Sequence, residues 1–435
     1  MPGVNGQTGD PAERSVPYFL AVGHYALGMG ASFVACWDWK DFRDCVFPWG
    51  VTHADLVAKP VLEAYRNQSL LFRTARPRYE PPELVLLIPD SLRFGPKTNE
   101  IHAALARATS WLMGCNAPFG VINEESLERL PTSCRAIVWP IPYCPTDDSF
   151  ARVRRFVESG GALLLTGDVR FGEDRQPTRS GRLQELGLSA TSAPRPPFPA
   201  DGTLARGAAT AACGKGTVSW VPFPLELDSG AAGGAVYREF LDRVGIARLH
   251  LEPDDGSVHA FEVPLQEGRA LVLYNDTAAR RSIAVAGSTL ARRIEVELDG
   301  GGSGFVLIRD GQVLAAEAQG RLTVDGRVIL QAEGRQAVLA LDGTDLAASK
   351  VLLVLPFGPG KATIPGVAGA PTPSVEIGEF RAGRWHPLGS EALPAADPRA
   401  LAVDASAPFD LRLVATPDRL AEARRAAEHL LSREP

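Results

Sequence analysis

A change of hydrophobic pattern near residue 250 sets the strongest limit on what this chain of 435 residues can fold into. Between Glu83 and Ile246, short apolar strands alternate with amphipathic helices, an order typical of a parallel sheet with helices on both faces. After about residue 250 the helical spacing stops, and short apolar runs are separated by Gly, Asn or Asp. That second pattern is typical of an antiparallel β-sandwich. The sequence therefore predicts an α/β region followed by an all-β region.

The middle region, residues 81–248, is predicted to be a flavodoxin-like domain built on a mostly parallel sheet. Apolar strands are expected at 83–89, 118–122, 134–142, 162–168 and 216–224, with helices between them. Thr146 precedes the helix that begins at Asp147, and its hydroxyl can accept a hydrogen bond from a free backbone N–H of the first turn. Serial strand–helix units of this kind cover both faces of the sheet.

The first region, residues 1–80, reads as helix, strand and helix. One helix is expected from Pro11 to Met29, closed by Gly28 and Gly30, and a second begins at Pro60, which suits the first helical position. Between them lies the apolar strand 31–39. This is the order of a (β/α)8 barrel fragment or of part of an open α/β sheet, and it is too short to be either alone.

The last region, residues 249–435, is predicted to be a β-sandwich domain with a charged helix near residues 417–432. Glycine and proline are frequent (43 and 35 residues), as expected where many turns join short strands. The fold class is therefore α/β plus all-β, organised as the segments 1–80, 81–248 and 249–435.

The most suggestive chemistry lies at the end of the strand 31–39, in the sequence WDWKDFRD. Aromatic rings can stack on the C–H faces of sugars, and carboxylates accept hydrogen bonds from hydroxyl groups. Trp37, Asp38 and Trp39 are therefore candidate carbohydrate-binding residues. The alternative is an aromatic strand end that closes a core. For Asp38 and Asp41, substrate binding or ion pairing with Lys40 and Arg43 is favoured over a catalytic pair, which would need a defined separation of its carboxyl groups.

Composition and charge argue against several other classes. The net charge is −6 with no basic block, so nucleic acid is not an expected partner. The longest apolar runs are of strand length, far below the roughly 20 residues of a membrane helix, and the N-terminal sequence has no signal-peptide pattern. The expectation is no membrane partner and a cytoplasmic location, with the compartment of any longer protein left open.

Cysteine and histidine patterns indicate neither a metal site nor a cofactor. The cysteines are far apart and without a C-x-x-C motif, and the histidines are isolated, so no metal ligand and no cofactor is predicted. A nucleophilic Cys144 after the strand 134–142 would suit an amidotransferase-like enzyme. However, Pro145 follows Cys144, and no nearby H-x-E motif supplies a base, so the hypothesis of an amidotransferase-like enzyme is the least favoured.

Several segments resemble the C-terminal two-thirds of family 42 β-galactosidases. YFLAVGHYALGMGASFVACWDWKDF and KPVLEAYRNQSLLF look like the last elements of a TIM barrel. FVESGGALLLTGD and GKGTVSWVPFPLE resemble the amidotransferase-like trimerisation domain, and LDGTDLAASKVLLVLP resembles the C-terminal β domain. The resemblance implies a glycoside hydrolase acting on a carbohydrate substrate and a homo-oligomer, by analogy a trimer. Trp37 matches the sugar-platform Trp of the eighth barrel strand, with Asp38 and Trp39 as weaker candidates.

The same resemblance implies that the catalytic part is missing. In such enzymes the two catalytic glutamates follow the fourth and seventh barrel strands, whereas only about 80 residues precede the flavodoxin-like region here. The expectation is a truncated glycoside hydrolase polypeptide without its Glu pair and without catalytic residues of its own. The alternative is a non-catalytic carbohydrate-binding or oligomerisation protein derived from such an enzyme.

Overall fold

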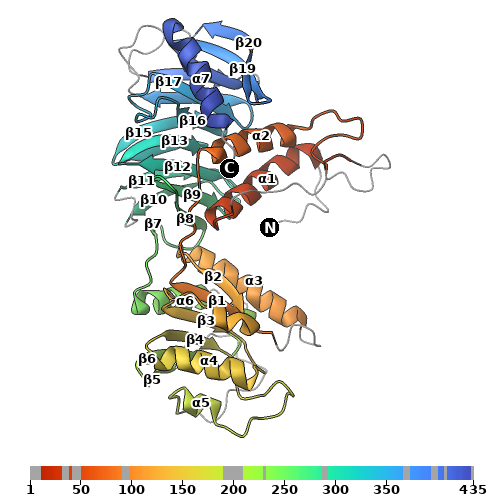
Figure 1. Ribbon diagram of the computed structural model, residues 1–435, viewed down its shortest axis with the longest axis vertical. Helices are drawn as coiled ribbons and strands as arrows, with labels where there is room; N and C mark the ends of the chain where they lie inside the picture. Colours follow the sequence, from red (N-terminus) through yellow and green to blue (C-terminus); the bar gives the residue numbers. More distant parts are fainter. Residues whose placement is uncertain are drawn as a thin grey trace. The chain divides into compact units, whose positions relative to one another are not determined.

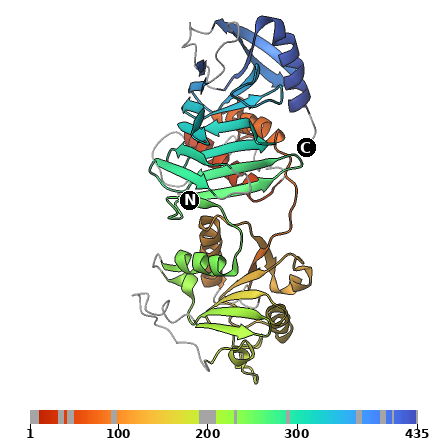
Figure 2. The same ribbon diagram turned by 90° about the vertical axis from the view of Figure 1, so that its left-hand side faces the viewer.

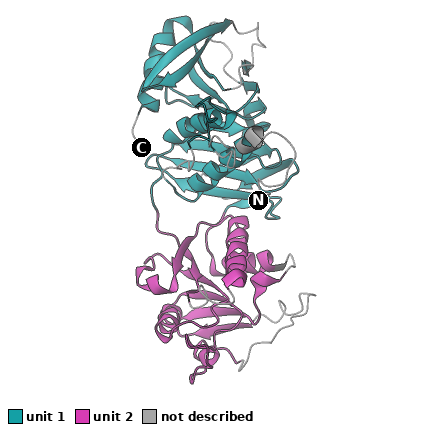
Figure 3. Ribbon diagram, turned by 90° about the vertical axis from the view of Figure 1, so that its right-hand side faces the viewer, with its two compact units in different colours: residues 1–79, 249–435 teal, residues 80–248 magenta. Residues whose placement is uncertain are grey.

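The computed structural model describes residues 11–31, 39–41, 50–90, 98–189, 209–228, 232–286, 292–365, 373–392, 400–405 and 409–432. The chain forms two compact units, coloured separately in Figure 3. Unit 1 comprises residues 1–79 and 249–435, and unit 2 comprises residues 80–248. Among the described helices, none is long and apolar enough to cross a membrane.

Unit 2 is built on one six-stranded sheet. Its strands are β1 (Leu84–Ile88), β2 (Gly120–Asn123), β3 (Ala136–Pro140), β4 (Ala162–Thr166), β5 (Ala209–Cys213) and β6 (Gly216–Val221). They lie in the order β2-β1-β3-β4-β6-β5, parallel except for β5, which pairs antiparallel with β6 at the edge. The helices are α3 (Thr98–Gly114), α4 (Asp147–Glu158), α5 (Arg182–Glu185) and α6 (Ala232–Val244), with 3-10 turns at Glu124–Arg129 and Leu225–Leu227.

Helices cover both faces of this sheet, as the predicted flavodoxin-like arrangement requires. Leu84 and Leu86 of β1 pack with α3 and α6 on one face, while Leu87 packs with α4 on the other. Successive strand side chains point to opposite faces, so a strand buried on both sides must be continuously apolar. Thr146 caps α4, its Oγ1 accepting from the Ser149 N–H at 3.0 Å, which confirms the predicted cap.

Unit 1 contains two antiparallel sheets. The seven-stranded sheet has the order β21-β18-β15-β14-β11-β10-β7, and the nine-stranded sheet has the order β20-β19-β22-β17-β16-β13-β12-β9-β8. The strands are β7 (His250–Glu252), β8 (Val258–Pro264), β9 (Arg269–Asn275), β10 (Arg281–Ala286), β11 (Ile294–Leu298), β12 (Ser303–Arg309), β13 (Gln312–Ala318), β14 (Arg321–Val324), β15 (Arg327–Glu333), β16 (Gln336–Ala340), β17 (Val351–Pro356), β18 (Gly360–Pro365), β19 (Ser374–Arg381), β20 (Arg384–Ala392), β21 (Ala400–Ala405) and β22 (Leu411–Ala415).

The helices of unit 1 are α1 (Pro11–Gly28), α2 (Pro60–Arg73) and α7 (Leu420–Leu431), and they cover the outer face of the nine-stranded sheet. In Figures 1 and 2, α1 and α2 (red and orange) lie against this sheet. In β17, Leu352 and Val354 enter the core between the two sheets, whereas Leu353 and Leu355 enter the core beneath the helices. The central strands are therefore fully apolar, and the predicted α/β plus all-β fold class is confirmed.

The two units divide the chain at almost the same points as the three predicted segments, after Tyr79 and Arg248. The units group the segments differently, because the N-terminal segment belongs to the same unit as the β-sandwich. The physical reason is that Leu20 of α1 and Leu71 of α2 are buried in the core between these helices and the nine-stranded sheet. The predicted strand 31–39 lies outside the described residues except for its two ends.

Candidate functional site

The sequence-predicted carbohydrate site lies in unit 1, and the structure describes only part of it. Trp37 and Asp38 lie outside the described residues. Trp39 is described, and 62% of it is exposed. Its backbone carbonyl accepts hydrogen bonds from the N–H and the Oγ1 of Thr52, at 3.0 and 2.9 Å. The backbone of Trp39 is thus fixed while its indole ring faces solvent.

Asp41, two residues further on, is a buried anchor. Its Oδ1 accepts from Lys59 Nζ at 2.8 Å and from the Gly50 N–H at 3.0 Å. Asp41 is 8% exposed and Lys59 4% exposed, so this is a buried ion pair. A Cβ on Gly50 would lie 2.3 Å from a backbone carbon of Lys40, so this close approach requires glycine.

Asp41 has a partner that the sequence did not indicate. The sequence favours substrate binding or an ion pair with Lys40 and Arg43, which are close along the chain. Its partner is Lys59, the residue before α2, and Arg43 lies outside the described residues. The chain folds back through the short bridge between Lys40 and Thr52, which places the start of α2 beside Asp41. The Asp41 carboxylate holds this part of the chain together and is not free for chemistry.

The carboxyl edge of the parallel sheet in unit 2 was the alternative place for a site, with Cys144 as a nucleophile. Cys144 is 2% exposed, and burial raises the pKa of its thiol. The thiolate is the reactive form, so this environment opposes nucleophilic chemistry. Just before it, Ile141 and Tyr143 adopt positive φ angles of 47° and 55°. A β-branched residue in that conformation marks strain, and no nucleophile occupies either position.

Glu124, at the same edge of unit 2, is a titratable group that the sequence argument did not single out. Its carboxyl group accepts from Trp139 Nε1 at 2.9 Å and from the Asp90 N–H at 3.1 Å. Burial raises the pKa of Glu124 to about 7. It joins the segments that follow β1 and β2 to the strand β3, and with 3% of its surface exposed it is a structural group rather than a substrate contact.

A second buried polar cluster has the composition of a catalytic triad. In unit 1, His24 Nε2 lies 2.8 Å from Glu317 Oε2, and Ser303 Oγ lies 3.1 Å from His24 Nδ1. All three residues are 0% exposed, so no substrate reaches them. Gln68 of α2 donates to the Leu20 carbonyl of α1 at 2.8 Å beside this cluster. These contacts fix α1 and α2 on the nine-stranded sheet, and residues so far apart in sequence give no local signal.

Metal ligation has no support from the described part of the chain, which contains no group of three or more His, Cys, Asp or Glu residues able to hold an ion.

Comparison with known proteins finds similarity in structure rather than in sequence. No protein-family model matches the chain, and no curated protein is similar to it in sequence. A β-galactosidase from Rahnella sp. R3 superposes with a TM-score of 0.51 at 15% sequence identity, covering 71% of this chain and 53% of that one. A GH42 β-galactosidase from G. stearothermophilus, solved as a catalytic mutant, gives a TM-score of 0.49 at 15% identity, with coverages of 68% and 51%.

The chain therefore spans about half the length of these enzymes. At 15% identity, the similarity to the Rahnella enzyme shows a shared fold. The predicted resemblance to the family 42 β-galactosidase architecture is confirmed at that level.

Proposed function

We propose that this chain is part of a glycoside hydrolase of β-galactosidase type, in which it supplies a carbohydrate subsite at Trp37, Asp38 and Trp39 rather than the catalytic carboxyl pair. The observation that carries the proposal is the exposed, backbone-anchored indole of Trp39 in a chain whose fold is similar to that of a β-galactosidase. Aromatic faces of this kind stack on sugar rings and make few demands on the linkage.

The surroundings of Trp39 support binding rather than bond cleavage. Glycosidic hydrolysis needs two accessible carboxyl groups, about 5–5.5 Å apart for retention or about 6.5–9.5 Å for inversion. Asp41 is buried and paired with Lys59, so using it as a nucleophile or acid would leave a buried ammonium group without its counter-ion. We therefore infer that this chain on its own does not hydrolyse glycosides.

Two assays test these two parts separately. Release of nitrophenol from aryl β-galactosides, and from other common aryl glycosides, should stay at background. In saturation-transfer NMR with a panel of neutral mono- and disaccharides, β-galactosides should give signal, and the Trp39→Ala variant should lose it. Turnover that vanishes in an Asp38→Asn or Asp41→Asn variant would contradict the non-catalytic assignment. Absence of binding to every saccharide would contradict the subsite.

Self-association belongs to the same proposal, because the resemblance implies a homo-oligomer built through the parallel-sheet domain. The strand β2 is an edge of that sheet, and Val121 on it is 46% exposed. Edge strands with free backbone groups and apolar side chains favour pairing with another chain. Sedimentation velocity should find an oligomer, with a trimer expected by analogy. A monomer at micromolar concentration would remove this part of the proposal and leave the saccharide subsite untouched.

A further inference from the structure

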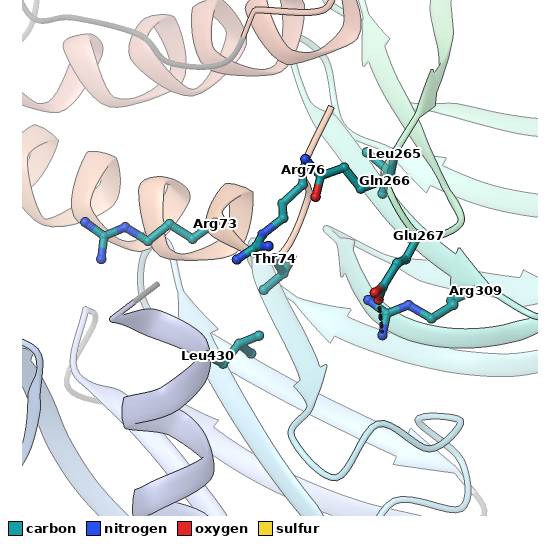
Figure 4. A pocket seen from close by; sticks show the side chains of 8 residues that line it. All are labelled: Arg73, Thr74, Arg76, Leu265, Gln266, Glu267, Arg309 and Leu430. Atoms are coloured by element: carbon teal, nitrogen blue, oxygen red, sulfur yellow. Dashed lines mark ion pairs between the residues drawn. The ribbon is translucent and has the colours of Figure 1, made fainter. Parts of the chain in front are cut away.

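A pocket in unit 1 is lined by arginine side chains that come from separate elements, and Trp39 is not among its lining residues (Figure 4). Arg73 and Arg76 come from the end of α2 and the segment after it. Gln266 and Glu267 come from the turn between β8 and β9, and Arg309 comes from the end of β12. Figure 4 shows the Arg73 side chain turned away from the others, so the charged groups that face the pocket are Arg76, Arg309 and Glu267, with a formal charge of +1.

The hydrogen bonds of these arginines show which of them are available to a ligand. Arg73 is engaged, because its Nη1 donates to the carbonyl of Leu431 at the end of α7. Arg309 Nη1 pairs with Glu267 at 3.1 Å, whereas its Nε is buried without a hydrogen-bond partner among the described residues. The exposed Arg76 guanidinium makes no ion pair or hydrogen bond within the described part of the chain. Arg76 therefore has its guanidinium donors to offer, and the half-exposed Arg309 offers those that its pair with Glu267 leaves unused, apart from the buried Nε.

Backbone contacts hold the walls of the pocket in place. The Gln266 N–H donates to the Arg76 carbonyl at 2.9 Å, and the Arg78 N–H donates to the Pro264 carbonyl at 2.9 Å. Gly268 has a φ of +87°, and a Cβ there would lie 2.2 Å from the Ile308 carbonyl oxygen, so the turn packs closely on the end of β12. A site whose backbone is fixed in advance loses less entropy on binding.

We infer that this pocket binds a tetrahedral oxyanion, a phosphate or sulfate group, either free or as an ester on a sugar. Arginine presents a planar fork of N–H donors that matches such a group, and charge-assisted bonds of this type are the strong ones. Arg76 and Arg309 donate to the anion, and Gln266, which also lines the pocket, carries a further amide donor. Glu267 competes with the anion for Arg309. Oxyanion binding here is independent of saccharide binding at Trp39.

Isothermal titration of the full chain with inorganic phosphate at low ionic strength tests this inference. Wild type should bind in the millimolar range, and Arg76→Gln and Arg309→Gln should each weaken binding about tenfold. Glu267→Gln should strengthen it about two- to fivefold, because it frees Arg309 and removes a negative charge. The matched control is Arg327→Gln, an exposed arginine at the start of β15 outside the pocket, which should bind as wild type does.

Further titrations with inorganic sulfate, galactose 6-phosphate and neutral galactose distinguish the source of the anion. Binding of the inorganic ions alone indicates a free-anion site, whereas tighter binding of galactose 6-phosphate indicates an esterified ligand. The inference is overturned if wild type binds none of the anions at 20 mM, a concentration roughly tenfold above the expected dissociation constant. It is equally overturned if Arg327→Gln weakens binding as much as Arg76→Gln, or if Glu267→Gln fails to strengthen it. All four positions are exposed or half-exposed, so the variants are expected to fold.

Discussion

Glu124 should make the stability of unit 2 depend on pH with an unusual sign. Removing its carboxyl group from water disfavours the charged form and raises its pKa from 4.5 to about 7. The native state therefore keeps a proton that the unfolded chain loses between about pH 4.5 and 7. Since the native state binds more protons in that window, the free energy of unfolding falls as pH rises through it, by about 3 kcal/mol in total.

The substitution Glu124→Gln isolates this contribution. Glutamine keeps an acceptor for Trp139 Nε1 but cannot also accept from the Asp90 N–H, at a cost of about 1–2 kcal/mol. At pH 5, just above the unfolded pKa, wild type has lost part of its contribution, so the variant should be less stable than wild type by up to about 1 kcal/mol. At pH 8, where wild type has lost its 3 kcal/mol, the variant should be about 1–2 kcal/mol more stable, with a crossing near pH 6.

The unfolding of unit 2 in urea can be followed within the full chain by the labelling of a buried cysteine thiol. Cys115 lies in unit 2 with 1% of its surface exposed, so a maleimide reaches it only when that unit opens. Labelling of Cys115, quantified by peptide mass after urea equilibration at pH 5, 6, 7 and 8, gives the free energy of unfolding for both proteins. Burial also raises the pKa of Glu226, and comparing variant with wild type cancels that contribution. If the difference in the free energy of unfolding between wild type and Glu124→Gln does not vary with pH, Glu124 does not hold a raised pKa in the native state.

Three further predictions concern single groups. Thr146→Ala should lower the free energy of unfolding of unit 2, measured in urea, by about 1 kcal/mol, because the α4 cap is lost. Thr146→Ser keeps a hydroxyl acceptor and should retain the wild-type stability. Equal destabilisation by both substitutions would show that the cap does not stabilise unit 2. Asp41→Ala should lower the free energy of unfolding of unit 1 by about 3–5 kcal/mol, because it leaves the buried Lys59 without its counter-ion. The control Asp55→Ala, at an exposed position, should lower it far less. Similar losses for the two variants would argue against a buried ion pair. Cys144 should react with a maleimide at pH 6 more slowly than a free thiol of pKa about 8.5. Rapid labelling would instead support the hypothesis of an amidotransferase-like nucleophile.

Much of the fold follows from local patterns in the sequence. The helices Pro11–Gly28 and Pro60–Arg73 were predictable because apolar spacing and an initial proline are properties of the segment itself. The edge strand β5 was not predicted, because its sequence ATAAC carries little apolar signal, although it pairs with β6 across the two-residue turn formed by Gly214 and Lys215. The docking of α1 and α2 on the nine-stranded sheet has only an indirect signal, the fully apolar strands such as β17 that demand cover on both faces.

The candidate sites were harder to predict, because their geometry depends on contacts between distant residues. Asp41 pairs with Lys59, 18 positions further along the chain, because the bridges of Thr52 to Lys40 and to Ala58 bring the start of α2 beside it. His24 meets Glu317 across 293 positions, and nothing near either residue in the sequence indicates the other. Trp39 was identifiable from its residue type and its place at the end of the predicted strand 31–39. Its exposure depends on the fold and could not be predicted from sequence.

Calorimetric titration of the full chain with a β-galactoside, for wild type, Trp39→Ala and Leu388→Ala, measures directly whether Trp39 belongs to a carbohydrate subsite. Leu388 is a matched control, because it is a large apolar residue with a similar exposure of 58%, against 62% for Trp39. The proposed subsite predicts that wild type and Leu388→Ala bind equally, and that Trp39→Ala binds at least about fivefold more weakly through the lost stacking. Equal binding by all three proteins, or no binding by wild type, would contradict the assignment of a carbohydrate subsite to Trp39.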